Sequence, residues 1–259
     1  ALPICKHLLI KAPPASGKSR ALMYVALDKL TNQGKKKIIV AVPEKSIGAS
    51  FDNTNLTDAG FFADWEVESR NNLCLGSGDD KSKVRSFVNF MKSDDKILVC
   101  THATLRFAFE DSELATELFN NCVLAIDEFH HVSVSENSRL GELLHNVMNQ
   151  TDVQIIAMTG SYFRGDAVPI LTPEDEAEFD KVTYTYYEQL NGYTHLKTLG
   201  IGYHFYTGSY LDDGALDAVL DSTKKTIIHI PNVNSKESTQ VGKHEEVTQI
   251  FDILGKIGR

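Results

Sequence analysis

Continuous apolar runs alternate with amphipathic segments over the N-terminal part of the chain. The predicted strands are residues 4–10, 37–42, 97–100, 122–126 and 153–158. The predicted helices are residues 19–30, 81–92, 103–119 and 138–149. Strands without polar alternation are typical of a parallel sheet that is covered on both faces. The pattern therefore predicts an α/β fold of the doubly wound kind, with a mainly parallel sheet.

The pattern changes near Asp166, where prolines and the acidic run 174–180 indicate a solvated connection. Later β-like stretches are predicted at residues 182–187, 199–206 and 226–230, and later helices at residues 215–221 and around Val247, Ile250, Phe251 and Leu254. The α/β alternation resumes near residue 212, and the about 35 to 50 residues that follow are too few for a domain of usual size. We expect a first domain over 1–165, a β-rich connection over 166–211 and the incomplete beginning of a second α/β domain over 212–259.

Composition narrows the class of protein. The 259 residues include 26 Lys and Arg against 35 Asp and Glu, a net charge of −9, so a polyanion would have to be held by local donors. No apolar stretch approaches the roughly 18 residues of a membrane span. Four scattered cysteines without a Cys-x-x-Cys pair favour buried thiols in a reducing compartment. We expect a cytoplasmic protein that has no membrane partner.

The strongest local signal is the octet Ala12-Pro13-Pro14-Ala15-Ser16-Gly17-Lys18-Ser19, between the first predicted strand and helix. Small residues there let backbone N–H groups surround phosphates, and the helix N-terminus adds a favourable dipole. Lys18 would reach the β- and γ-phosphates, and the Ser19 hydroxyl would ligate Mg²⁺. Taken alone, the octet is better explained as a Gly-Lys-Ser turn that opens a helix by chance.

A second signal follows the predicted strand 122–126, which ends in Asp127-Glu128-Phe129-His130. Open α/β sheets bind ligands at this carboxyl edge. Asp127 can hold the Mg²⁺ water shell, and Glu128 can orient or deprotonate an attacking water. The plainer alternative is that the two acids cap the next helix. A pair that ends a buried strand after a candidate phosphate-binding loop favours the functional interpretation.

Four segments taken together resemble the motifs of a known family. They are residues 12–19, 101–105, 127–130 and 159–161, which resemble motifs I, Ib, II and III of superfamily 2 helicases and translocases, in that order. The family often has Ala-Pro-Thr-Gly-Ser-Gly-Lys-Thr as motif I, from which Pro14, Ala15 and Ser19 depart. Asp127 to His130 is a DExH-type motif II. The resemblance covers roughly residues 4–165 and implies a RecA-like ATPase domain that uses ATP and Mg²⁺.

The resemblance also implies a set of site residues. The nucleotide-binding residues would be Ala12, Pro13, Pro14, Ala15, Ser16, Gly17, Lys18, Ser19 and Arg20. The catalytic residues would be Lys18, Asp127, Glu128 and His130, with Ser19 and Asp127 at the metal. Residues implied in coupling hydrolysis to domain movement are Thr159, Gly160 and Ser161. Those implied at the nucleic-acid backbone are Pro43, Glu44, Lys45 and Ser46 of motif Ia, and Thr101, His102 and Thr104 of motif Ib. For Thr101 and Thr104, helix capping is an equally good explanation.

The main hypothesis is the motor domain of a nucleic-acid-dependent ATPase, whose partners are single-stranded DNA or RNA and the rest of a parent polypeptide. A P-loop kinase and a nucleotide-dependent interaction module without unwinding activity are the alternatives. Nothing after residue 235 resembles an arginine-rich motif VI, so the isolated chain is expected to hydrolyse ATP slowly or not at all. For the seven tyrosines from Tyr184 onward, cross-strand pairs on a β-ribbon are favoured over base stacking.

Overall fold

The computed structural model describes residues 6–75, 79–111, 114–129, 139–160, 173–194 and 243–256. The chain divides into two compact units, residues 1–195 and 196–259. The predicted elements at 199–206, 215–221 and 226–230 lie outside the described residues, as do His130 and Ser161. Among the described helices, none has both the length and the apolar character that spanning a bilayer requires.

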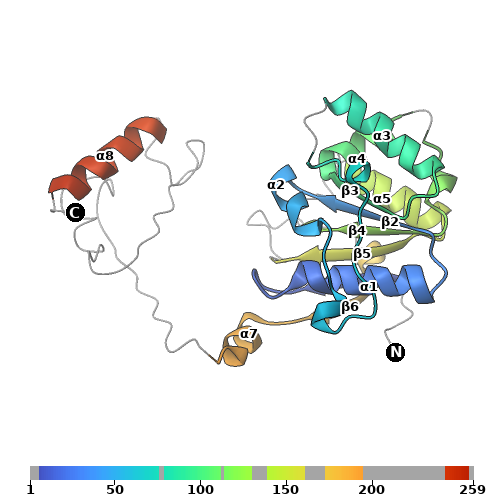
Figure 1. Cartoon of the computed structure of the whole chain (residues 1–259), viewed down its shortest axis with the longest axis horizontal. Helices are drawn as coiled ribbons and strands as arrows, with labels where there is room; N and C mark the ends of the chain where they lie inside the picture. Colours follow the sequence, from blue (N-terminus) through green and yellow to red (C-terminus); the bar gives the residue numbers. More distant parts are fainter. Residues whose placement is uncertain are drawn as a thin grey trace. The chain divides into compact units, whose positions relative to one another are not determined.

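The first unit is built on one sheet (Figure 1). Its strands are β1 (His7–Lys11), β2 (Lys37–Val42), β3 (Ile97–Thr101), β4 (Cys122–Ile126), β5 (Gln154–Thr159) and β6 (Phe179–Thr183). They are all parallel and follow the order β3-β2-β4-β5-β1-β6. Parallel strands require crossover connections, and the helices between them supply these connections. The doubly wound α/β fold predicted from the sequence is confirmed.

Helices cover both faces of the sheet. The helices of the first unit are α1 (Lys18–Asn32), α2 (Lys45–Gly48), α3 (Asp80–Lys92), α4 (His102–Phe109), α5 (Arg139–Gln150), α6 (Pro173–Ala177) and α7 (Tyr186–Gly192). Short 3₁₀ turns lie at Ala49–Phe51, Thr57–Ala59, Ser69–Asn71 and Thr116–Phe119. α3, α4 and α5 pack on one face, while α1 and the segment that carries Phe51 and Trp65 pack on the other. Because both faces are buried, the inner strands carry apolar residues at nearly every position.

Two predicted elements differ from the structure. The helix predicted over 103–119 ends as α4 at Phe109, and the chain then turns at Asp111, whose carbonyl accepts a hydrogen bond from Leu114 N (3.0 Å). The strand predicted over 182–187 ends at Thr183, and α7 begins at Tyr186. A capping box explains this second difference, because the Thr185 and Glu188 side chains each accept a bond from the other's backbone N–H.

The tyrosine prediction is therefore wrong for the described part of the cluster. Tyr186 and Tyr187 are helical and exposed, so they form no cross-strand pair. Residues 173–194, which lie within the predicted connection, supply α6, β6 and α7, and β6 extends the first sheet beside β1. In the second unit the described helix is α8 (Lys243–Lys256), where Ile250 is buried while Val247 and Phe251 are exposed.

The cysteine prediction agrees with the structure for three of the four residues. Cys74, Cys100 and Cys122 are free thiols and are buried, and Cys5 lies outside the described residues. Burial raises the pKa of Cys122 to about 11 and that of Cys100 well above its ordinary value. Both thiols are therefore protonated and unreactive at neutral pH.

Candidate functional site

The loop predicted to bind phosphate lies at the carboxyl end of β1 and leads into α1. Ala15 (φ 59°) and Gly17 (φ 85°) both adopt the left-handed backbone conformation, which curls the chain back on itself. Ala12 N donates to Thr159 O (3.1 Å) and so ties the loop to the end of β5. Ala15 stands where the family usually has glycine, and a Cβ in this conformation costs roughly 1–2 kcal/mol. The loop keeps its curl despite this departure.

The start of α1 is left open. Gly17 is its N-cap residue and provides no side-chain hydrogen bond to the first turn. Backbone N–H groups of a first helical turn have no partner within the helix, and they attract anions. The Ser16 Oγ atom, in the same loop, is buried and has no hydrogen-bond partner in the described part of the chain. These unused donors suit a bound phosphate group.

Segments from motifs I, II and III meet in front of this loop. Lys18 Nζ donates to Pro13 O (3.3 Å) and lies 3.8 Å from Glu128 Oε1. Glu128, itself in a left-handed conformation (φ 46°), accepts at Oε2 from Gly160 N (3.3 Å). A Cβ built on Gly160 would lie 3.1 Å from Lys18 Nζ. The lysine, the acid and the glycine therefore form one cluster.

Asp127 is buried at the end of β4, with 4% of its surface exposed. Its N–H donates to Ala41 O (2.9 Å), and its Oδ1 accepts from Glu128 N (2.9 Å). Burial raises the pKa of the Asp127 carboxyl, and the Glu128 N–H partly opposes this shift. A nearby cation would favour the ionised form again. His102 Nε2 donates to the Asp127 carbonyl (3.0 Å), so a residue implied at nucleic acid also holds the backbone of motif II.

Lys18, Asp127 and Glu128 line one cleft of about 580 Å³, a volume typical of small-molecule sites. Its lining residues are Pro14, Ala15, Gly17, Lys18, Ser19, Arg20, Ile47, Ser50, Asp127 and Glu128. Ser19 and Asp127 contribute a hydroxyl and a carboxylate, which are oxygen ligands of the kind that Mg²⁺ prefers. Among the described residues no group of three or more His, Cys, Asp or Glu could hold a metal alone. The Ser19 hydroxyl and the Asp127 carboxylate are thus of the kind that fits a magnesium ion.

The remaining predicted residues have other positions. Arg20 lines the cleft, and its Nη1 donates to Thr54 Oγ1 (3.0 Å). Lys45 and Ser46 are exposed in α2, after Pro43 at the end of β2. Thr101 is the N-cap of α4 and accepts from Thr104 N (3.1 Å), while Thr104 is itself buried. Helix capping, the alternative explanation for the two threonines, is thus present in the structure.

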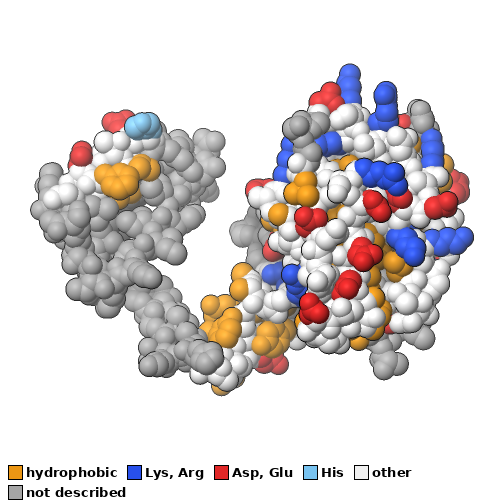
Figure 2. Space-filling view, in the orientation of Figure 1, with side chains coloured by type: hydrophobic (Ala, Val, Ile, Leu, Met, Phe, Trp, Pro, Cys, Tyr) orange, Lys and Arg blue, Asp and Glu red, His pale blue; other side chains and the backbone are white. Residues whose placement is uncertain are grey.

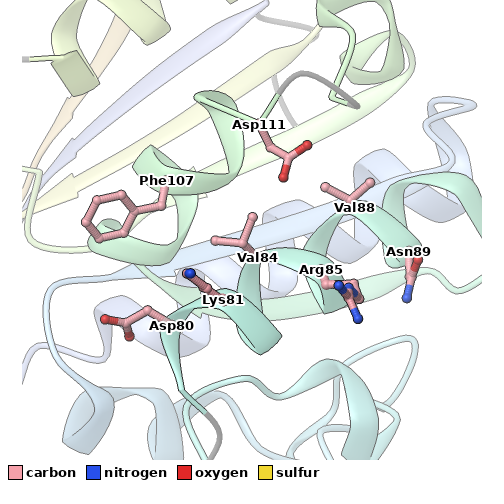
Figure 3. Close-up of a pocket in the computed structure, with 8 residues that line it drawn as sticks. All are labelled: Asp80, Lys81, Val84, Arg85, Val88, Asn89, Phe107 and Asp111. Carbon is pink, nitrogen blue, oxygen red and sulfur yellow. The ribbon is translucent and has the colours of Figure 1, made fainter.

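A second cavity, of about 560 Å³, lies between α3 and α4 (Figure 3). Its lining residues are Asp80, Lys81, Val84, Arg85, Val88, Asn89, Phe107 and Asp111. None of these belongs to the predicted motifs. Its walls combine apolar side chains with charges of both signs, and this composition does not indicate a particular ligand. This groove shares no lining residue with the candidate site.

Sequence reasoning missed Gln189 of α7. Its side chain is buried, and Nε2 donates both to Pro14 O (3.1 Å) in the phosphate-binding loop and to the Tyr193 hydroxyl (3.0 Å). The pairing of β6 with β1 brings α7 to the loop, and Tyr184 N donates to Lys11 O (2.8 Å) at the same place. A glutamine in a polar helix carries no signal for a contact across 175 residues.

A family model described as "DEAD/DEAH box helicase" matches residues 2–165. The chain belongs to this family. The match covers the segments that carry motifs I, Ib, II and III, so the resemblance to helicases found in the sequence is confirmed.

A curated relative and several solved structures are similar to the chain. It is 63% identical over 252 residues to "Putative ATP-dependent helicase YeeB" of Bacillus subtilis (strain 168), a match that covers 97% of this chain and 41% of that protein. The chain thus spans less than half the length of this relative. The Pyrococcus furiosus Hef helicase domain matches 70% of the chain and 36% of its own at 17% identity, with a TM-score of 0.46. The UvsW helicase of bacteriophage T4 matches 68% and 55% at 18% identity, with a TM-score of 0.42.

Proposed function

We propose that the chain is the nucleotide-binding part of a motor that couples Mg-ATP hydrolysis to movement along, or unwinding of, DNA or RNA. The observation that carries the proposal is the 3.8 Å approach of Lys18 Nζ to Glu128 Oε1 in the cleft at the start of α1. Two segments that are remote in sequence supply a cation for phosphate and a carboxylate for water at one place. This combination is what phosphoryl transfer to water requires.

In the proposed reaction each side chain has a separate role. Lys18 leaves the Pro13 carbonyl and Glu128 and binds the β- and γ-phosphates, while the open first turn of α1 and the loop N–H groups hold the phosphate oxygens. Ser19 and Asp127 would hold Mg²⁺, which when bound neutralises charge on the phosphates. Glu128, released from Lys18, orients the attacking water and accepts its proton.

Gly160 is proposed to couple the state of the nucleotide in the cleft to movement of the rest of the motor. Its N–H donates to Glu128 Oε2 (3.3 Å), so a shift of Glu128 toward water weakens this contact. Thr159, the preceding residue, holds the phosphate-binding loop through Ala12. We infer that Thr159 and Gly160, with Ser161 beyond the described residues, transmit the nucleotide state, as the family resemblance implies.

The nucleic-acid strand is proposed to cross the carboxyl ends of β2 and β3. Pro43, Lys45 and Ser46 follow β2, while Thr101 ends β3, its neighbour in the sheet, and His102 follows it. Figure 2 supports a local mode of contact, because Lys and Arg are interspersed with Asp and Glu over the visible face of the first unit. Backbone amides and single lysines would then position the phosphates. The proposed partners are single-stranded DNA or RNA and the remainder of the parent protein.

The test is the ATPase rate of the full-length parent, with and without single-stranded DNA or RNA. Stimulation by either strand is expected, with inorganic phosphate released to water. An unstimulated rate would contradict the motor proposal in favour of an interaction module. Transfer of phosphate to an added acceptor would identify a kinase instead. The chain alone, without an arginine-rich motif from the rest of the parent, should turn over slowly or not at all.

A further inference from the structure

Lys83, in α3, is a buried cation without a hydrogen-bond partner among the residues that the structure describes. Lys83 lies in the first turns of α3, and 4% of its surface is exposed. Its Nζ atom is buried and has no hydrogen-bond partner in the described part of the chain. Burying an ammonium group without a partner is costly, and buried lysines are normally paired. The position therefore favours an anion as partner, and no side chain in the described part of the chain hydrogen-bonds to Lys83 Nζ.

Repulsion from a second lysine adds to the cost of burying Lys83. The ammonium of Lys45, in α2, faces the ammonium of Lys83, and this repulsion adds to burial in lowering the pKa of Lys83. The Cys74 thiol also lies beside the two lysines, but burial raises its pKa and keeps it neutral. Asp80, in the first turn of α3, acts in the opposite direction and favours the charged lysine. α2 packs closely against Cys74, because a Cβ on Gly48 would lie 2.3 Å from Cys74 Cβ.

We propose that Lys83 and Lys45 together bind one phosphate of the nucleic-acid strand. The inference rests on the proposed function, since Lys45 belongs to the segment expected to touch that strand. Lys83 adds a contact from a helix that none of the four motifs includes. Neither lysine lines the nucleotide cleft, so the ligand is a strand phosphate rather than a phosphate of ATP.

A phosphate between the two lysines would remove both the lack of a partner for Lys83 Nζ and the repulsion between the two ammonium groups. It gives Lys83 Nζ a charged partner, and it replaces repulsion between the two ammonium groups by attraction of each to one anion. Lys45 is exposed, so its long side chain can turn aside to admit the phosphate. Ordering of Lys45 on binding is then the structural change that the proposal requires.

The test measures binding of a fluorescently labelled single-stranded oligonucleotide to the full-length parent by anisotropy, over a range of salt concentrations. Lys83→Met removes the charge and retains the apolar stem. Lys81→Met is the matched control, because Lys81 lies on the same helix, two residues away and about 200° around it, and lines the groove between α3 and α4 (Figure 3). Loss of one phosphate contact should weaken binding roughly tenfold and reduce the slope of log affinity against log salt by about 0.7.

We expect the loss with Lys83→Met and with Lys45→Met, and an unchanged slope with Lys81→Met. The double variant Lys45→Met/Lys83→Met should lose less than the sum of the two single losses, since both lysines hold one phosphate. The melting temperature of Lys83→Met without ligand should equal or exceed that of the wild type, because an unpaired buried charge is removed.

Two results separate the inference from the proposed function. A wild type that binds the strand, with Lys83→Met binding equally well and with the same salt slope, overturns the inference and leaves the proposed function intact. A wild type that does not bind either DNA or RNA overturns the proposed function and the inference with it. If Lys83→Met does not fold, Lys83→Arg replaces it: retained affinity with the wild-type slope supports a charge contact, and loss of binding in a folded Lys83→Arg protein contradicts it.

Discussion

The starts of α1 and α4 occupy equivalent places, each following a parallel strand of the same sheet, yet they are built differently. Gly17 opens α1 in a left-handed conformation and gives its first turn no side-chain cap. Thr101 opens α4 in an extended conformation, and its hydroxyl caps Thr104 N. One end leaves its N–H groups to a ligand, and the other satisfies them from within the chain.

The contrast extends to the charges beside each helix start. At α1, the Lys18 ammonium contacts the Pro13 carbonyl and the Glu128 carboxylate. A phosphate group can replace both of these contacts. By contrast, Lys45 in α2 and Lys83 in α3 lie close enough for their ammonium groups to repel each other. The proposed nucleotide site thus already holds its lysine in place, whereas at the proposed strand site the two ammonium groups repel each other until a phosphate binds.

The largest expected effect is the loss of ATPase rate when Glu128, the carboxylate of the cleft nearest Lys18, is replaced. Glu128→Gln in the full-length parent removes the group proposed to accept the water proton, and the ATPase rate should fall about 10²- to 10⁴-fold. Nucleotide affinity should change little, since the amide retains the size of the carboxylate. Steady-state hydrolysis and nucleotide titration measure the two quantities separately, with Glu66→Gln, an exposed acid outside the cleft, as control. A comparable rate loss in the control would contradict the assignment.

Removing the side-chain cap at the start of α4 should lower the stability of the fold and leave nucleotide binding unchanged. Thr101→Ala removes the cap of α4 and should lower the free energy of unfolding by about 1 kcal/mol, with nucleotide affinity unchanged. Chemical denaturation with and without Mg-ATP provides both readouts. Thr101→Ser retains a hydroxyl and should recover most of the stability. Nucleotide binding that drops in Thr101→Ala but not in Thr101→Ser would show that the two helix starts are not independent.

The pH dependence of stability distinguishes the acid of the cleft from a surface acid. The folded-state pKa of Asp127 is raised by burial, so its contribution falls as pH rises from 3.8 through that raised value. Asp127→Asn should therefore gain melting temperature over the wild type as pH increases toward neutrality.

Asp95 should show the opposite sign, because hydrogen bonds from Asn71 and then Arg70 lower its pKa. Its contribution is present above pH 3.8 and is lost as pH falls through the lowered value. Asp95→Asn should be less stable than the wild type at neutral pH and approach it in acid. Thermal melts of both variants from pH 3 to 8 check the pair, and curves of the same sign would contradict the assigned causes.

The smallest effect sharpens the comparison at the open helix start. Ala15→Gly removes the cost of a Cβ in the left-handed conformation but increases the freedom of the unfolded chain, so we expect a gain of up to about 1 kcal/mol. Ala21→Gly, at an exposed position inside α1, should instead cost about 1 kcal/mol. Equal losses in the two variants, measured by denaturant unfolding, would mean that Ala15 is not strained.

The inner strands, and the approach of Lys18 to Glu128, could be predicted from the sequence. β2 and β4 have the predicted bounds, because their uninterrupted apolar residues are needed to bury both faces. Lys18 and Glu128 meet because their segments follow parallel strands, whose carboxyl ends share one edge of the sheet.

The remaining features depend on contacts that local patterns do not encode. β6 is buried only at Phe179, so it lacks a clear apolar signal, and α7 depends on a capping box. Gln189 reaches Pro14 only because β6 pairs with β1. The burial of Lys83 Nζ without a hydrogen-bond partner in the described part of the chain likewise depends on which side chains surround it after folding.

The central claim is that Lys18 and the acids of motif II share one Mg-nucleotide. Titration of the wild-type chain with a fluorescent ATP analogue, with and without Mg²⁺, tests it most directly when repeated on Lys18→Ala and Glu128→Gln. The account predicts magnesium-dependent binding that Lys18→Ala abolishes and Glu128→Gln preserves. Undiminished binding in Lys18→Ala, or an equal loss in both variants, would contradict it.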